Sequence, residues 1–350
     1  MPAPTKMTYR FLGNSGLLVS KLALGMWMFL DEKKTADAWY EMMQIAFKNG
    51  VNFYDNAEVY GGDGKSEEIM GSAIQKGIAD GVWSREDLVV TTKICMGINF
   101  EECNPNGQGI GRKHLIEGTR ASLRRMQLDY VDVIFCHRPE TYTPIEETVR
   151  AMNHIIEQGW AFYWGTSEWN AADIVEACEI ADRLGLIRPI VEQPQYSLME
   201  RSKVEFEFAP LYKKYKLGLT TWAPLANGIL TGKYSGGVTE GTRFSSDFFK
   251  SVFGGTFDEG VAKADKLKAI ADEVGCTLAQ LATAWCISNE NVSTVLVGAS
   301  RPSQLEENLK SIAFVQQLTP EVKAHMNEIA TFTPQLPKPD PLAAFRGRWL

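Results

Sequence analysis

Apolar residues along the chain gather into eight short runs, and each run is followed by a loop and then by a stretch with amphipathic helical periodicity. The runs are apolar almost throughout, which is typical of strands buried on both faces of a parallel sheet. The predicted strands are Leu22–Met26, Asn52–Ala57, Leu88–Ile94, Tyr130–His137, Ala161–Ser167, Ile190–Tyr196, Leu217–Leu225 and Val292–Ala299. The predicted helices occupy residues 35–49, 66–79, 112–127, 145–158, 171–184, 204–215, 261–289 and 302–312.

The alternation of strands and helices predicts the fold. Eight β/α units in 350 residues indicate an α/β fold, the (β/α)8 TIM barrel, with the strands forming a closed inner sheet. Helix start signals support this pattern, since Thr277 precedes a long apolar run. Residues 8–19, with turn residues from Gly13 to Gly16, predict a β-hairpin that would plug the bottom of the barrel.

A doubly wound sheet is the competing architecture. Its dinucleotide fingerprint, GxGxxG after the first strand, is missing, because that strand ends in LALGMW. The triplet Gly64-Lys65-Ser66 imitates the end of a phosphate-binding P-loop, but Val59 occupies the position of the required first glycine. The sequence therefore favours the barrel.

Two segments fall outside the repeating pattern. The stretch from Asn227 to about Gly260 is rich in Gly, Ser and Phe. As a long loop after the seventh barrel strand, it would overhang the C-terminal face, where ligands bind. Residues 331–350 form a Pro-rich extension that would wrap around the barrel, remain flexible or contact another subunit. We expect one domain over residues 1–350, with its core at about 8–330.

Composition narrows the function. A net charge of −7 and a pI near 5.4 give no basic surface for nucleic acid. The N-terminus lacks an apolar signal region, and no apolar run approaches the length of a membrane span, so we expect a cytoplasmic protein without membrane insertion. The six cysteines form no CxxC pair and the four histidines show no zinc-like spacing, so no metal site is expected.

Four ionisable residues stand at the upper ends of three consecutive predicted strands. Asp55 and Tyr60 follow the second strand, Lys93 lies near the end of the third, and His137 ends the fourth. A tyrosine can donate a proton to a carbonyl oxygen as a hydride arrives, and a neighbouring lysine would lower its pKa from about 10. Asp55 would hold the charge of Lys93, and His137 would orient the carbonyl.

Other interpretations exist for these residues. Taken singly, the carboxylate could cap a turn, the phenol could pack in the core, the lysine could extend along the surface, and the histidine could be a hydrogen-bonded barrel residue. Their joint occurrence at three successive strand ends favours a catalytic group. A hydrolase with paired carboxylates such as Glu140 and Glu192 is a further alternative, but it leaves the tyrosine and the lysine unexplained.

The motifs around these residues resemble a known family. NFYDNAEVYG, TTKI and CHRPE are similar to the catalytic tetrad motifs of the aldo-keto reductases, which are NADPH-dependent barrel enzymes. FLGNSGLLVSKLALGMW, TPIEETVRAM, QGWAFYWGTSEW, LTGKY and QLATAWCISNENVSTVLVGAS resemble the branch that contains the voltage-gated potassium channel β subunits and their plant and microbial relatives. The similarity extends from about residue 8 to 330. It implies reduction of aldehydes and ketones to alcohols, with Tyr60 as the general acid.

The resemblance also implies the cofactor site. NADPH or NADP+ would lie extended across the top of the barrel, without a Rossmann unit. The matching positions are Trp27, Asp55, Ser167, Glu168, Gln193, Trp222, Ala223, Pro224, Leu225, Ala226, Asn227, Gly228, Lys233, Arg243, Gly298, Ser300, Arg301, Gln304, Glu307 and Asn308. The free N–H groups at the start of the last predicted helix, beside Arg301, suit a 2′-phosphate and favour NADPH over NADH.

The implied substrate pocket would draw aromatic walls from Trp27, Tyr60 and Trp169, with His137 beside them. Phe residues of the 244–257 loop would add to these walls or simply pack the loop down.

Three positions separate this chain from some family members. Ala223 stands where relatives commonly carry Ser, and Glu168 stands where animal channel subunits tend to have Arg. His137 is present, whereas mammalian channel subunits tend to have Asn there. The complete tetrad favours a reductase that acts on a small carbonyl substrate.

The alternative is a cytoplasmic β-type subunit of a voltage-gated potassium channel, with bound NADP(H) as a redox sensor. This role would bring a channel α subunit as partner and a homotetramer, as in relatives of that branch. Only about seven residues precede the hairpin, which argues against an inactivating N-terminal tail.

Overall fold

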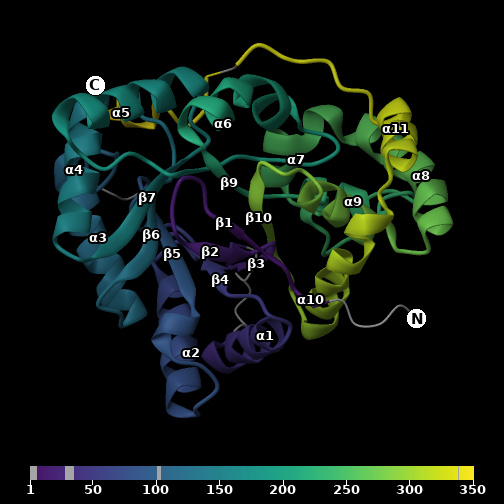
Figure 1. Ribbon diagram of the computed structural model, residues 1–350, viewed down its shortest axis with the longest axis horizontal. Coiled ribbons are helices and arrows are strands. Elements are labelled where there is room, and N and C mark those ends of the chain that lie inside the picture. Colours follow the sequence, from purple (N-terminus) through teal and green to yellow (C-terminus); the bar gives the residue numbers. More distant parts are fainter. Residues whose placement is uncertain (1–5, 28–34, 101–103, 338) are drawn as a thin grey trace.

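The computed structural model describes residues 6–27, 35–100, 104–337 and 339–350. Eight parallel strands close into a barrel, and helices surround it (Figure 1). In order around the barrel the strands are β10 (Val292–Val297), β3 (Leu22–Gly25), β4 (Phe53–Asp55), β5 (Val89–Ile94), β6 (Val131–Cys136), β7 (Ala161–Ser167), β8 (Val191–Gln193) and β9 (Gly218–Thr221). Each predicted strand is present, and the (β/α)8 prediction is confirmed.

The helices follow the predicted order with three differences. Their bounds are α1 (Ala36–Lys48), α2 (Lys65–Ala79), α3 (Arg112–Met126), α4 (Ile145–Glu157), α5 (Ala171–Leu184), α6 (Ala209–Tyr215), α7 (Asp247–Phe253), α8 (Phe257–Val274), α9 (Leu278–Ile287), α10 (Pro302–Leu309) and α11 (Pro320–Ile329). The prediction of one helix over 261–289 is wrong, because Gly275 ends α8 with a φ of +77° and Thr277 caps α9 by accepting from the Gln280 N–H. The sequence pattern also did not predict α7, in the segment after β9, or α11.

The N-terminal hairpin closes the bottom of the barrel, as predicted. Strands β1 (Tyr9–Phe11) and β2 (Leu18–Ser20) pair antiparallel, and the turn between them meets the starts of β8 and β9. Gly13 has a φ of +57°, and a Cβ at this position would lie 2.1 Å from the Ile190 carbonyl oxygen. Only glycine fits this approach of the hairpin to the barrel floor.

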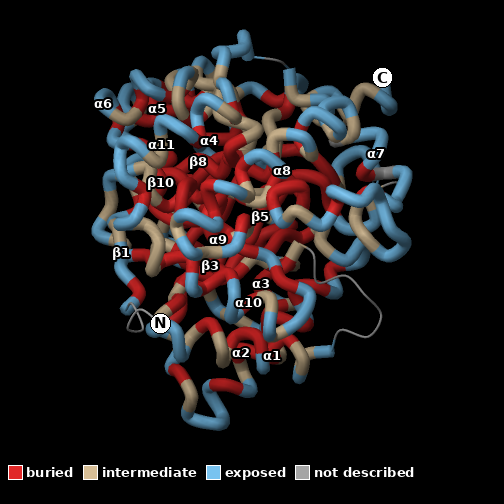
Figure 2. Tube along the Cα trace, turned by 90° about the vertical axis from the view of Figure 1, so that its right-hand side faces the viewer, coloured by how far each residue is buried: buried red, intermediate tan, exposed pale blue. Residues whose placement is uncertain are grey.

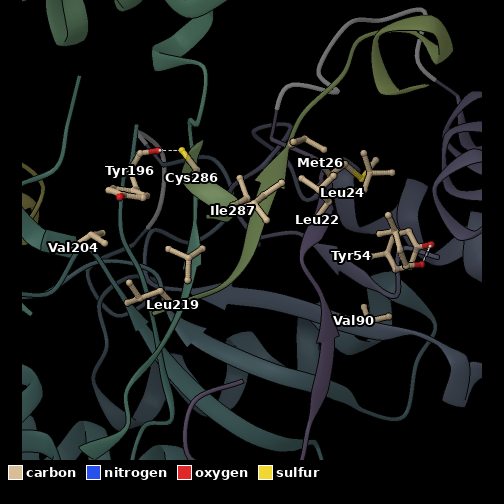
Figure 3. Packing of buried hydrophobic residues seen from close by; sticks show 14 of the residues in the cluster. Leu22, Leu24, Met26, Tyr54, Val90, Tyr196, Val204, Leu219, Cys286 and Ile287 are labelled. Carbon is tan, nitrogen blue, oxygen red and sulfur yellow. Dashed lines mark hydrogen bonds between the residues drawn. The ribbon is translucent and has the colours of Figure 1, made fainter. Parts of the chain in front are cut away.

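Two sets of buried apolar side chains stabilise the fold. One fills the lower barrel interior, where Leu12 and Val19 of the hairpin pack with Phe53 and Phe135 from the strands. The other lies between strands and helices, and Figure 3 shows residues of this layer such as Leu22, Leu24, Tyr54 and Val90. Buried residues occupy the centre of the molecule, and exposed residues surround them (Figure 2). This packing leaves the upper end of the barrel for a site.

The C-terminal segment wraps against loops at the upper end of the barrel. The Thr141 N–H donates to the Ala343 carbonyl at 2.9 Å, and the Arg346 guanidinium pairs with Glu140 at 3.2 Å. Arg348 donates to Gln108 Oε1 at 2.6 Å. These contacts bring the end of the chain beside the loops that follow β5 and β6. Within the described ranges, no helix combines the length and the apolar content needed to cross a membrane.

Candidate active site

The predicted catalytic residues meet at the upper end of the barrel. Lys93 Nζ lies 2.5 Å from Asp55 Oδ2, 2.7 Å from the Asn56 carbonyl oxygen and 3.2 Å from the Tyr60 hydroxyl. The rings of Tyr60 and His137 stand edge to face, with centroids 5.6 Å apart. The ammonium group therefore links the carboxylate to the phenol, and the imidazole packs against the phenol ring.

Barrel geometry positions these side chains. Asp55 is the last residue of β4 and pairs with Thr91 of β5 in the parallel register, so both side chains point into the barrel. Thr91 Oγ1 donates to Asp55 Oδ1 at 2.8 Å, and Gln193 Nε2 of β8 donates to the same oxygen at 3.2 Å. The carboxylate of β4 is thus held by side chains from two other strands, β5 and β8. Because its orientation is fixed in this way, Lys93 has a defined partner.

Burial and charge set the protonation states. Burial alone would lower the pKa of Lys93, but the charges of Asp55 and Tyr60 leave it above its usual value, so Lys93 stays charged. Burial raises the pKa of Tyr60, and Lys93 offsets this only in part. The expected lowering of the Tyr60 pKa is therefore wrong, and the phenol keeps its proton. Burial, Lys93 and Arg138 hold the pKa of His137 well below its usual range, which makes the imidazole neutral.

A cavity of about 600 Å³ opens above the tetrad. Its lining includes Gly25, Trp27, Asp55, Val59, Tyr60, Gly61, Gly62, Met96, Phe100, His137, Arg138, Ser167, Gln193, Trp222, Ala223, Pro224, Leu225, Asn227, Arg243, Leu296, Val297, Gly298, Asn308 and Leu342. Most of this surface is apolar, with a few polar groups, which is the usual character of a small-molecule site.

A second carboxylate fixes the loop beside the cavity. Glu58 accepts from the N–H groups of Cys95 and Gly97, each at 2.8 Å, and lies 3.0 Å from His114 Nε2. Burial raises the pKa of Glu58, but His114 and the two N–H groups outweigh it, so the pKa lies below its usual range. The residues directly after β5, and with them the position of Lys93, are thereby held in place.

Comparison with known proteins agrees with this geometry. The profile described as the aldo/keto reductase family matches residues 21–331. This chain belongs to the aldo/keto reductase family. A protein of Arabidopsis thaliana named "Probable voltage-gated potassium channel subunit beta" is 49% identical over 334 residues, which cover 95% of this chain and 99% of that protein. A protein of the same name from Oryza sativa subsp. japonica is 48% identical over 94% of this chain and 98% of that protein.

A third relative, from Schizosaccharomyces pombe, carries the same subunit designation and is 43% identical over 95% of both chains. The resemblance to the potassium channel β-subunit branch is thus confirmed. As an aldo/keto reductase, the chain is an oxidoreductase by family.

In this aldo/keto reductase, part of the predicted cofactor set lines the cavity. The residues brought together there are Trp27, Asp55, Ser167, Gln193, Trp222, Ala223, Pro224, Leu225, Asn227, Arg243, Gly298 and Asn308. Those predicted for the cofactor that lie outside the lining are Glu168, Ala226, Gly228, Lys233, Ser300, Arg301, Gln304 and Glu307. The side chain of Gln304 accepts from Ser300 N–H and Oγ, which ties the first turn of α10 to the residue before its N-cap, Arg301.

Several groups in and near the cavity fit a nicotinamide dinucleotide. Trp27 and Trp222 stand edge to face with ring centroids 5.9 Å apart and offer aromatic surface. Buried Asn227 Oδ1 has no hydrogen-bond partner among the described residues. Arg243 lines the cavity and is partly buried, yet it forms no ion pair with any described carboxylate. A partly buried guanidinium without an internal anion suits a phosphate.

Two residues predicted for the cofactor site and the substrate pocket do not line the cavity. Glu168 has a φ of +59°, and its carboxylate accepts from Trp222 Nε1 at 2.9 Å and pairs with Lys203 at 2.8 Å. It thus holds the Trp222 indole in place from outside the cavity. Trp169 is 1% exposed and lies outside the cavity lining, against a separate cavity beside the loop after β6. The structure therefore does not bring Trp169 to the tetrad.

The long segment after β9 has a mixed role. Phe244 and Phe257 pack against Tyr234 with ring centroids 5.5 and 5.2 Å away, so they hold the segment down. The ring centroid of Phe249 lies 6.1 Å from that of Trp27. Phe249 does not line the cavity itself but packs against this residue of the cavity wall. Of the two expectations for these phenylalanines, packing of the loop describes them better.

Sequence reasoning missed several cavity residues. Arg138 directly follows His137 in the motif CHRPE, so its proximity could have been inferred. Met96 and Phe100 belong to the loop after β5, and Leu342 comes from the C-terminal segment. No sequence pattern places Leu342 there, because the tail must first pack against the barrel. The hydrolase carboxylates Glu140 and Glu192 do not line this cavity.

Proposed function

We propose that this chain is an NADPH-dependent reductase of aldehydes and ketones. The observation that carries the proposal is the position of Lys93 Nζ between Asp55 and Tyr60, two residues that line a largely apolar cavity. This arrangement gives the phenol a proton to donate and a neighbouring cation to stabilise the phenolate that remains.

The residues of the chain divide the work of carbonyl reduction. Bound NADPH would supply the hydride. Tyr60 donates its hydroxyl proton to the carbonyl oxygen, and Lys93 stabilises the resulting phenolate until it is reprotonated. Neutral His137 offers a hydrogen-bond donor to the same oxygen and orients it. The apolar walls exclude water and hold the two reacting centres close together.

The choice of NADPH over NADH rests on charge. Lys233, Arg243 and Arg301 form no ion pair with a described carboxylate, and Arg301 precedes the N-terminus of α10. An unpaired cation at a helix start suits the extra phosphate of NADPH. Ser167 and Gln193 line the cavity with groups that can bind the nicotinamide carboxamide.

The test compares wild type with Tyr60→Phe. We expect wild type to oxidise NADPH with a panel of aromatic aldehydes, followed by the loss of NADPH absorbance. The variant should bind NADPH with unchanged affinity, measured by fluorescence quenching, and lose roughly a hundredfold or more in kcat. Full activity in Tyr60→Phe would refute the assigned role, and tight NADPH binding without turnover in wild type would refute the reductase.

A second function is favoured by the names of the relatives. We infer a cytoplasmic β-type subunit that assembles as a homotetramer with a voltage-gated potassium channel and senses redox state through NADP(H). Identity of 43% to 49% over nearly the whole chain supports this role. Co-purification with a channel α subunit from native membranes, and a tetrameric mass in solution, would test it. A monomer that retains no channel protein would refute it.

A further inference from the structure

Arg138 supplies a positive charge in the cavity that the reductase chemistry does not use. It follows His137 at the end of β6, and its side chain lines the cavity together with Tyr60 and His137. The centre of its guanidinium lies 6.0 Å from the Trp222 ring centroid. Its charge also contributes, after burial and Lys93, to the low pKa of His137. The guanidinium therefore lies within electrostatic range of the reacting groups.

The hydrogen-bonding capacity of Arg138 is largely unused. Its Nε is buried and has no hydrogen-bond partner among the described residues. Its only ion pair within those residues is with Asp340 of the C-terminal segment, and the distance from Arg138 Nη1 to Asp340 Oδ2 is 3.6 Å. That distance exceeds the usual length of a charge-assisted hydrogen bond. By contrast, Lys93 directs its ammonium group to three protein oxygens.

The surroundings favour recognition of an anion. The side chain of Arg138 is 19% exposed, so water screens its charge only partly. Leu342, two residues after Asp340, also lines the cavity. A planar guanidinium with free donors matches a carboxylate in two-pronged geometry, whereas a neutral carbonyl compound would leave it with only its long contact to Asp340.

We propose that Arg138 binds a carboxylate group of the substrate, so that the preferred substrates are carbonyl compounds that also carry a carboxylate. The inference rests on the proposed reductase function, since it names the substrate class of the same cavity. The carboxylate pairs with Arg138 while the carbonyl oxygen lies between Tyr60 and His137. Asp340 competes with this carboxylate for the guanidinium, and the C-terminal segment thereby sets the strength of acid binding.

The kinetic test uses a matched pair of aldehydes, 4-carboxybenzaldehyde and methyl 4-formylbenzoate, which differ in charge at one end. The measured quantity is the ratio of kcat/KM for the acid to kcat/KM for the ester. Arg138→Gln should lower this ratio about tenfold or more, the expected loss for a charged hydrogen-bonded pair, and Arg138→Lys should lower it less. Asp340→Asn should raise the ratio about threefold, because it removes the competing charge but keeps an acceptor for the Leu342 N–H.

The control is Arg183→Gln. Arg183 pairs with Glu146 at 3.1 Å on the surface and is 62% exposed, so the substitution removes the same charge far from the tetrad loops. Its acid-to-ester ratio should equal that of wild type. An unchanged ratio in Arg138→Gln, or an equal fall in the control, would overturn the proposal.

A binding experiment separates this inference from the reductase proposal. NADP+-saturated protein is titrated with 4-(hydroxymethyl)benzoate and with its methyl ester, by calorimetry. Weaker binding of the acid to Arg138→Gln, with binding of the ester unchanged, supports the carboxylate site even where no aldehyde is reduced. Equal binding of the acid to wild type and variant overturns it, as does a variant that loses NADP+ affinity instead.

Discussion

The buried pair between Lys93 and Asp55 should show strong energetic coupling. The side chains are 0% and 3% exposed, and the Nζ–Oδ2 distance is 2.5 Å. Lys93→Met leaves a buried carboxylate without a counter-charge. Asp55→Asn likewise leaves a buried ammonium group without a counter-charge. The double variant Asp55→Asn/Lys93→Met removes both charges and keeps the volumes similar.

The expected loss of stability follows from the cost of keeping an unpaired charge away from water. Removing one partner of a buried ion pair costs about 3–5 kcal/mol, whereas replacing both by neutral groups is often close to neutral. Lys93→Met also leaves the Asn56 carbonyl oxygen without the donor it has at 2.7 Å. We expect each single variant to lower the free energy of unfolding by about 3–5 kcal/mol. The double variant should cost at least about 2 kcal/mol less than the sum of the two single costs.

The assay is urea unfolding at pH 7, followed by the fluorescence of the nine tryptophans. The control pair is Lys113 and Glu117, which also lie 2.5 Å apart but are 61% and 62% exposed. Lys113→Met should barely change the unfolding midpoint, because solvent screens the exposed pair. Strictly additive costs for Lys93→Met and Asp55→Asn would refute the coupling.

Two further predictions concern stability. Burial raises the pKa of Glu192 from its ordinary value of 4.5 to about 8. Between these values the folded chain binds more protons than the unfolded chain, so its stability falls as the pH rises through them. Glu192→Gln, whose side chain can still accept from Thr166 Oγ1, should therefore raise the unfolding midpoint more at pH 8 than at pH 5; equal gains would contradict the assignment. Gly13→Ala should lower the free energy of unfolding by about 3 kcal/mol or more, because its Cβ would collide with the Ile190 carbonyl oxygen. Gly16→Ala, with nothing within 4 Å of its Cβ, should have the melting temperature of wild type. Equal melting temperatures of the two variants would contradict the hairpin plug.

The convergence of the tetrad could be predicted because barrel strands run parallel. Asp55, Lys93 and His137 each stand within one residue of the C-terminal end of a strand, and such ends share one face whatever the helices between them do. Tyr60 lies five residues beyond Asp55, within reach of the same face. Strand order and these positions therefore sufficed to identify the group of four.

Other features depend on three-dimensional packing. The sequence places Lys93 beside Tyr60, but the net direction of the tyrosine's pKa depends on burial, which outweighs the lysine. Glu168 follows a cavity residue, yet its left-handed backbone directs the carboxylate to Lys203 and Trp222. Leu342 reaches the cavity through tail contacts that no local pattern encodes.

Closure of the barrel has a consequence for biosynthesis. Strand β3 pairs with β10, and the paired residues Leu22 and Val295 are 295 − 22 = 273 positions apart. At roughly 5–20 residues per second, a ribosome needs about 14–55 s to produce the second strand after the first. Throughout that time one edge of β3 and the apolar face of the hairpin lack their final partners. Nascent chains of this protein should therefore depend on chaperones that bind early and release late.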